Sequence, residues 1–220
     1  SAAALATLNI GWSQNSNGAG GARGGATGLL DTTQGSFIAE LSTLAIGRTG
    51  NFGTADGTFI MGSGASVNAN VVNVGMGAGA SGRLEVLADV LSFSGTGTAL
   101  NFGTGTLNIA GPGFTIGSPA DAVSDVRIGY HVAGKGSATT AIDFATTDPN
   151  FTAFIGNDLS IGRETGAANF ETSTANGSLT LGSNSTITLG SAAALATLNI
   201  GWSQNSNGGG GAWGSATGLF

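Results

Sequence analysis

Four aspartates are the residues that could most readily support hydrolysis. Asp121, Asp125, Asp143 and Asp148 are close in the sequence, and enzymes that cleave polysaccharides use paired carboxyl groups as acid and as base or nucleophile. Their spacing is unequal, and each lies in sequence typical of turns. We therefore predict that they are solvated loop acids and that the chain is not an enzyme.

Two further patterns could bind a ligand. His131 is the only histidine and follows Tyr130 just past an expected strand. It has no obvious carboxylate or thiolate neighbour, so we expect it at the surface rather than as a base or metal ligand. Segment 77–82 has the glycine spacing of a dinucleotide-binding loop, but no convincing long helix follows to hold a phosphate. The glycine tract 18–25 lacks the aspartate of calcium-binding repeats. We expect no cofactor and no metal ion.

The tryptophans lie near glycine-rich segments. Trp12, Trp202 and Trp213 follow or occupy such segments, where an indole could stack on a sugar ring or on a neighbouring molecule. Packing of the loop against its own chain is the alternative, and the sequence does not decide between the two. These residues form a candidate contact loop, and we expect segment 12–25 to protrude.

The chain ends by repeating its beginning. Segment 191–220 matches segment 1–30 at 26 of 30 positions, so that Ser191 is the counterpart of Ser1. Near-identical units serve to build length, whereas duplicated active sites are rarely needed. We predict that residues 1–190 form one complete repeat unit, and that residues 191–220 start the next unit and continue the same fold.

Short segments of alternating apolar and polar residues recur and end in glycine. This alternation predicts strands, and the glycine predicts a sharp turn. The predicted turn glycines follow one another at nearly equal intervals: Gly47, Gly75, Gly103, Gly129, Gly156 and Gly182. Extended to Gly20 and Gly210, the spacing gives seven steps within one repeat.

Apolar residues stand one and three positions before these glycines. In a strand such positions share one face, so strands stacked in register would align them in a ladder. The predicted ladder consists of Leu44, Ile46, Val72, Val74, Leu100, Phe102, Val126, Ile128, Ile155, Leu179 and Leu181. The sequence thus predicts an all-β fold, a parallel β-solenoid (β-helix) of about seven coils of ~27 residues in each 190-residue repeat.

The composition excludes several classes of partner. Charged residues make up 8 % of the chain and the net charge is −6. The cations are scattered singly, so we expect no nucleic-acid partner. Cysteine is absent, which excludes disulfides and thiolate metal sites. No apolar run reaches the ~18 residues of a membrane span, so we expect none in this segment of sequence.

Segments 159–162, 179–182 and 198–201 (Leu-Ser-Ile-Gly, Leu-Thr-Leu-Gly and Leu-Asn-Ile-Gly) resemble repeats of large bacterial surface proteins of the autotransporter-passenger and giant-adhesin type. The resemblance implies a secreted parallel β-helix at the cell surface. We therefore expect a structural repeat of an extracellular fibre, stalk or filament that stacks end to end on copies of itself and can also bundle laterally. The alternative is a multivalent adhesin whose tryptophan loops bind glycans or other surface material.

Overall fold

The computed structural model describes residues 5–14, 24–50, 53–77, 79–86, 99–109, 114–132, 136–167, 172–205 and 213–220. Strands make up 73 % of the structure, and every strand pairing in these ranges is parallel. The predicted all-β, parallel character is therefore confirmed. No described helix is both long and apolar enough to cross a membrane.

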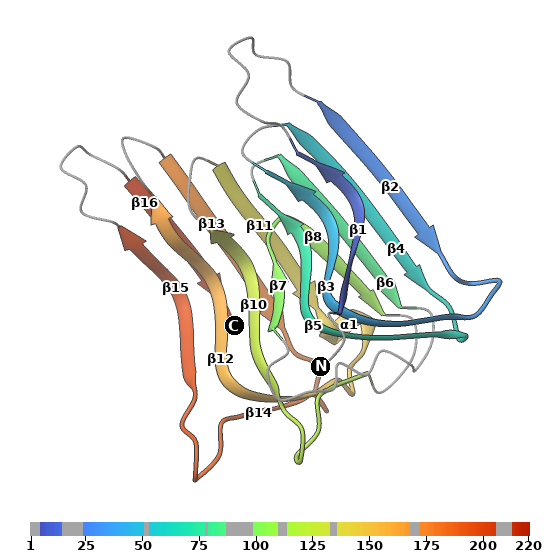
Figure 1. Cartoon of the computed structure of the whole chain (residues 1–220). Coiled ribbons are helices and arrows are strands. Elements are labelled where there is room, and N and C mark those ends of the chain that lie inside the picture. Colours follow the sequence, from blue (N-terminus) through green and yellow to red (C-terminus); the bar gives the residue numbers. More distant parts are fainter. Residues whose placement is uncertain are drawn as a thin grey trace.

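The largest sheet, sheet A, runs through the whole molecule (Figure 1). Its strands lie in the order β1 (Ala6–Ser13), β3 (Phe37–Thr49), β5 (Ala65–Met76), β7 (Ala99–Phe102), β10 (Val123–Val132) and β12 (Thr152–Ala167). Beyond β12 lie β14 (Thr186–Leu189) and β15 (Thr197–Asn205), whereas β9 (Thr115–Ile116) pairs with the start of β12. The two copies of the repeated sequence thus supply β1 and β15, at opposite ends of the sheet.

Two smaller sheets form the opposite layer (Figure 1). Sheet B contains β2 (Gly25–Asp31), β4 (Thr54–Met61), β6 (Ala80–Val86) and β8 (Gly105–Ile109). Sheet C contains β11 (Gly136–Asp143), β13 (Thr172–Thr180) and β16 (Trp213–Leu219), and helix α1 (Phe144–Thr147) follows β11. The chain alternates between sheet A and this layer, first with B and then with C, so that sequence order becomes order along the stack.

Like residues align along sheet A. Ile46 pairs with Val74, Val74 with Phe102, and Phe102 with Ile128. The column goes on through Ile161 to Ile200, and in the other direction it ends at Ile10. A second column, two residues earlier in each strand, consists of Leu8, Leu44, Val72, Leu100, Val126, Leu159 and Leu198.

Part of the predicted ladder lies elsewhere. Ile155 lies in an earlier part of β12, where it pairs with Leu189 of β14 and with Val123 of β10. Leu179 lies in sheet C opposite Ile142, and Leu181, just past β13, packs against the core as a half-buried side chain. The predicted marker glycines Gly156 and Gly182 are displaced with them.

The count of strand spacings also differs from the prediction. From β1 to β15, sheet A contains six spacings between strands, where seven were predicted. Seven glycines directly follow the column, one on each strand, and so define six intervals: Gly11, Gly47, Gly75, Gly103, Gly129, Gly162 and Gly201. The interval from Gly103 to Gly129 is the shortest, and the interval from Gly162 to Gly201 is one and a half times as long as that. The equal spacing that the prediction assumed is therefore wrong.

Sheet A touches the opposite layer along these glycines. Gly47 has φ +63°, and a Cβ built on it would lie 1.7 Å from the carbonyl oxygen of Ser81. On the facing strand, a Cβ on Gly57 would lie 2.1 Å from the backbone nitrogen of Gly47. The facing column is Gly28, Gly57, Gly82 and Gly105 in sheet B, then Thr140, Gly177 and Gly218 in sheet C. A double column of glycines thus brings the two backbones into contact.

Thr140 is the one position in the facing column that is not glycine, and it lies where sheet B gives way to sheet C. Its buried hydroxyl donates to the carbonyl oxygen of Gly103 and accepts from the nitrogen of Gly105 at 3.3 Å. Thr104 adds a hydroxyl bond to the carbonyl oxygen of Ser137 at 3.3 Å. Side-chain hydrogen bonds therefore join the adjoining strands β8 and β11.

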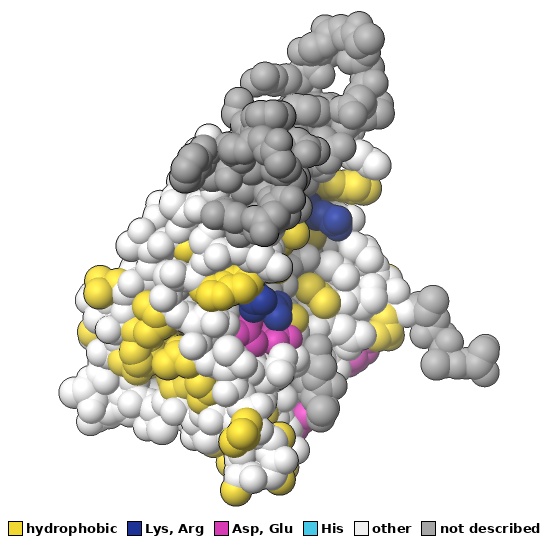
Figure 2. All heavy atoms as spheres, turned by 90° about the vertical axis from the view of Figure 1, so that its left-hand side faces the viewer, with side chains coloured by type: hydrophobic (Ala, Val, Ile, Leu, Met, Phe, Trp, Pro, Cys, Tyr) yellow, Lys and Arg dark blue, Asp and Glu magenta, His cyan; other side chains and the backbone are white. Residues whose placement is uncertain are grey.

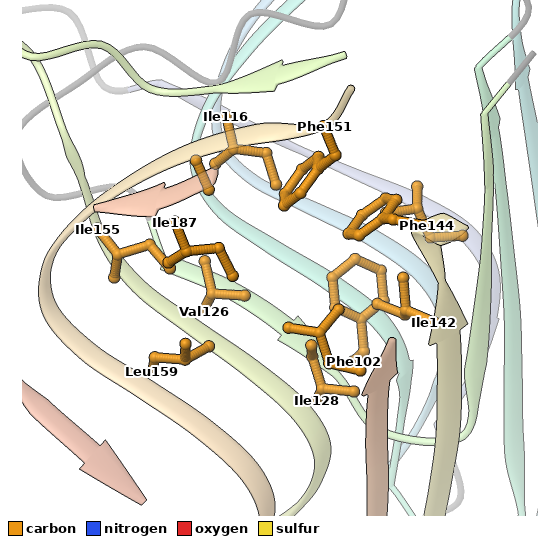
Figure 3. Close-up of a pocket in the computed structure, with 13 residues that line it drawn as sticks. Phe102, Ile116, Val126, Ile128, Ile142, Phe144, Phe151, Ile155, Leu159 and Ile187 are labelled. Carbon is orange, nitrogen blue, oxygen red and sulfur yellow. The ribbon is translucent and has the colours of Figure 1, made fainter. Parts of the chain in front are cut away.

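The double column divides the interior into two compartments. The apolar compartment contains the hydrophobic core, with Phe144 and Phe151 stacked at 3.7 Å between ring centroids. Figure 3 shows its side chains converging on a small cavity of about 20 Å³, lined entirely by apolar residues such as Phe102, Ile128 and Ile155. A cavity of this size without polar partners stays dry.

The polar compartment lies beyond the glycines. Sheet A contributes buried Ser13, Thr49, His131 and Glu164, and sheets B and C contribute small buried residues such as Ala55. Small residues suit this space because the glycine contact draws the backbones close together.

Candidate functional site

The four aspartates that were considered for hydrolysis lie at separate places. Asp121 lies in a turn with Ser118, and Asp143 caps helix α1 by accepting from the nitrogen of Thr146 at 3.2 Å. Asp125 and Asp148 are buried, so the prediction of solvated loop acids is wrong for both. Asp148 accepts from the nitrogen of Phe114 at 2.6 Å, a role in the turn structure.

The histidine is also buried, contrary to the sequence interpretation. His131 is 4 % exposed in the polar compartment, and its strand register places it opposite Glu164. Burial lowers the pKa of His131, and the negative charge of Glu164 offsets part of this effect. Nδ1 of His131 is buried and has no hydrogen-bond partner in the described structure. Within the described residues, no group of three His, Asp or Glu side chains could hold a metal ion.

The most connected side chains lie where the second copy of the repeat meets β12. Asp158 is the centre of this cluster: its carboxylate accepts from Arg163 Nη1 at 2.6 Å and from Arg127 Nε at 3.1 Å. It also accepts from Ser160 at 2.9 Å and from Asn199 Nδ2 at 3.0 Å. Asn199 belongs to β15, so this carboxylate joins the second copy to the preceding strands.

The charge cluster continues away from β15. Arg127 pairs with Asp125 at 3.0 Å and donates to the side-chain oxygen of Asn101 at 3.0 Å. Asn101 in turn donates to the side chain of Asn73 at 3.0 Å. Since Asn73, Asn101 and Arg127 occupy one register position on successive strands, a polar ladder runs along sheet A.

Aromatic and guanidinium groups form a second column beside this cluster. The Arg163 guanidinium carbon lies 4.9 Å from the ring centroid of Trp202 and 6.0 Å from that of Tyr130. The three residues are register partners on β10, β12 and β15. Such cation–π contacts with a partly buried cation stabilise the packing by about 0.5–2 kcal/mol.

Glu164 completes the contact from inside the polar compartment. This side chain is fully buried, and its carboxylate accepts from Ser173 at 2.9 Å and from Ser203 at 3.0 Å. A Cβ on Gly214 would lie 2.3 Å from Glu164 Oε2, so a larger residue there would displace the carboxylate from its present position. Ser203 and Gly214 both belong to the second copy, which therefore covers Glu164.

We call these contacts the junction site: Asp158, Arg163 and Glu164 on β12, Ser173 on β13, and Asn199, Trp202, Ser203 and Gly214 from the second copy. The first copy carries the same four residue types at Asn9, Trp12, Ser13 and Gly24. There, Ser13 donates to the carbonyl oxygen of Gly24 at 3.1 Å, and the buried side-chain oxygen of Asn9 has no partner in the described structure.

The end of the stack at β15 and β16 exposes apolar side chains. Leu198, Ile200 and Leu219 lie there at 45–65 % exposure. Figure 2 shows hydrophobic side chains gathered on this face beside a small group of basic and acidic side chains. Ile10, the counterpart of Ile200, is only 5 % exposed, although each of the two residues has one neighbouring strand in sheet A. This apolar position is thus covered in the first copy and open in the second.

The predicted contact loop is only partly described. Trp12 and Trp202 lie within strands β1 and β15 rather than in loops, and Trp213 begins β16. Loop residues 15–23, in which the protrusion was expected, lie outside the described residues. The junction site was missed because its members come from positions as distant in the sequence as Asp158 and Gly214.

Comparison with protein-family models, with curated proteins and with solved structures finds no match for this chain.

Proposed function

We propose that the chain is a structural repeat of an extracellular fibre, stalk or filament, in which successive repeat units continue one another as a parallel β-solenoid. The observation that carries the proposal is the placement of the repeated segment. As residues 191–220 it pairs with β12 and β13, and as residues 1–30 it pairs through its other edge with β3 and β4. A repeated segment inside a continuous stack would need a neighbour at each edge. The two copies in this chain each have one of these two neighbours.

Composition supports the same proposal. A low density of charge weakens repulsion between stacked or laterally bundled copies. The open strand edges at both ends would recruit further strands unless another unit covered them. A location at the bacterial cell surface is part of the proposal and is supported by the resemblance of segments 159–162, 179–182 and 198–201.

The length of multi-repeat chains tests this function. Six spacings of ~4.8 Å give an axial advance of about 29 Å for each repeat. Chains with one, two and four consecutive copies of segment 1–190 should therefore form rods whose length, measured by electron microscopy, increases by this amount per repeat. Particles that stay compact, or that lengthen without a constant increment, would contradict the proposal.

A second candidate is a glycan-binding adhesin, which the exposure of Trp12 favours. Trp12 is 44 % exposed at the end of sheet A, and its indole plane could stack on a sugar ring. Glycan-array binding that disappears in Trp12→Ala, with the unfolding midpoint unchanged, would support this function. Equal signals from the wild type and the variant would argue against it.

A further inference from the structure

We propose that the face of β12 and β13 now covered by β15 and β16 is a docking site for strands β1 and β2 of a second copy of this chain. The site is the junction site with its own covering segment exchanged for the equivalent segment of another molecule. The inference rests on the proposed function because it names the partner of the same stacking contact. It adds that separate molecules join by strand exchange.

The first argument is chemical identity. Strand β15 is anchored by Asn199 on Asp158, Trp202 on Arg163, and Ser203 on Glu164. Strand β1 carries the same three side chains at the same spacing, as Asn9, Trp12 and Ser13. Gly24 also reproduces Gly214, the residue whose missing Cβ leaves room for the Glu164 carboxylate.

The second argument is which edge is free. Strand β15 uses one edge to pair with β12, and β1 uses one edge to pair with β3. Along sheet A, β15 follows β12 in the same direction in which β3 follows β1. Strand β15 therefore uses the edge that faces the start of the sheet, and β1 uses the opposite edge. The free edge of β1 is thus the edge by which β15 attaches to β12. A second molecule can present β1 to β12 without giving up its own pairing with β3.

The third argument is that β1 leaves an aromatic surface uncovered. Trp12 keeps 44 % of its surface exposed. In the junction site the corresponding tryptophan, Trp202, has the Arg163 guanidinium as its neighbour. Docking would place the Arg163 guanidinium of the other molecule beside Trp12.

Cysteine pairs in this cysteine-free chain provide the test. Thr165 on β12 is the register partner of Gln204 on β15, and Gln14 is the equivalent of Gln204 in the first copy. Adjacent strands bring such positions within the Cα separation that a disulfide tolerates. In the Gln14→Cys/Thr165→Cys chain, a disulfide between molecules reports exchange. The Thr165→Cys/Gln204→Cys chain is the control and should give an internal disulfide.

Matched substitutions in the two copies then set the direction of exchange. Asn199→Ala/Trp202→Ala/Ser203→Ala in the Gln14→Cys/Thr165→Cys background weakens the resident segment, and disulfide-linked oligomers should increase at least tenfold. Asn9→Ala/Trp12→Ala/Ser13→Ala weakens the incoming segment, and oligomers should fall below the level of the parent.

Three outcomes would overturn the inference. The first is an equal yield of oligomers from both triple variants. The second is association without the disulfide, which would assign the contact to β15 on β1. The third applies if the variant with the weakened resident segment does not fold. The Gln14→Cys/Thr165→Cys chain then decides, and the absence of an intermolecular disulfide as its concentration rises would refute exchange. Rods of multi-repeat chains would still lengthen by a constant increment, so this failure is distinguishable from failure of the proposed function.

Discussion

The two compartments of this molecule are built from the same strands but are stabilised differently. The apolar compartment is filled by large side chains stacked in columns, so its stability arises from burial of apolar area and from close packing. The polar compartment holds a fully buried carboxylate and a buried imidazole whose neighbours are fixed by strand register. Packing tolerates similar shapes, whereas a buried carboxylate requires particular donors. We therefore expect sequence changes to be tolerated better in the apolar compartment.

The largest expected effect removes the boundary between the compartments. Gly47→Ala places a Cβ 1.7 Å from the backbone oxygen of Ser81 at a residue with φ +63°, so the two sheets must separate. We expect a loss of about 4 kcal/mol or more in the free energy of unfolding, measured by urea denaturation. Gly35→Ala is the control, because its Cβ would meet nothing within 4 Å. Equal losses in the two variants would refute contact along the double column.

The next effect compares covered and open positions of one apolar column. Ile46 is fully buried, whereas Ile200 is 45 % exposed at the end of the stack. Ile46→Ala should lower the free energy of unfolding by about 3 kcal/mol. Ile200→Ala should lower it by less than about 1 kcal/mol, because little area is lost from the interior. Thermal unfolding of both variants checks the ratio, and an Ile200→Ala loss as large as that of Ile46→Ala would contradict the open end.

A smaller effect concerns the one residue that replaces glycine in the facing column. Thr140→Val keeps the shape of the side chain but removes a hydroxyl that bonds Gly103 and Gly105. Because both backbone groups then lose their partner, we expect about 1–3 kcal/mol of destabilisation. Hydrogen exchange should also rise at the Gly105 amide. Thr139→Val on the exposed neighbouring position is the control, and unchanged exchange in Thr140→Val would argue against the bridge.

The smallest effect is a dependence on pH that belongs to the polar compartment. Burial lowers the pKa of His131 in the folded chain, so the unfolded chain binds the proton more tightly. The contribution of neutral His131 to the free energy of unfolding is therefore fully present above the pKa of about 6.5 in the unfolded chain. It is lost as pH falls towards the lower pKa of the folded chain, with a slope of at most about 1.4 kcal/mol per pH unit. Denaturation at pH 7.5 and 5.5 should show a smaller difference for His131→Gln than for the wild type. Identical differences would show that His131 does not titrate on unfolding.

The columns were predictable from the sequence up to Ile128, because there the intervals between glycines are nearly equal. Beyond it, two segments of β12 both match the strand pattern, one ending at Gly156 and one at Gly162. The structure uses Gly162, which has φ +66° and whose Cβ would lie 1.9 Å from the backbone oxygen of Thr217, whereas a Cβ on Gly156 has no neighbour closer than 3.5 Å. That choice depends on the facing sheet, which a strand pattern does not describe.

The polar compartment could not be predicted for a related reason. His131 and Glu164 are far apart in the sequence and become neighbours only through the pairing of β10 with β12. Once that register is known, Glu164 falls opposite Ser203 in the same way. The polar compartment is thus a consequence of register, whereas the apolar columns up to Ile128 can be recognised from residue type and spacing.

The division of one layer into sheets B and C has a mechanical consequence. Sheet A carries an unbroken backbone ladder from β1 to β15, but the opposite layer is bridged at β8 and β11 by the side chains of Thr140 and Thr104. Under bending, the weakest link in the layer is this bridge, so strain concentrates there. In the proposed rod of many units, this bridge would recur once per repeat, and we expect the rod to resist stretching along sheet A and to bend near Thr140.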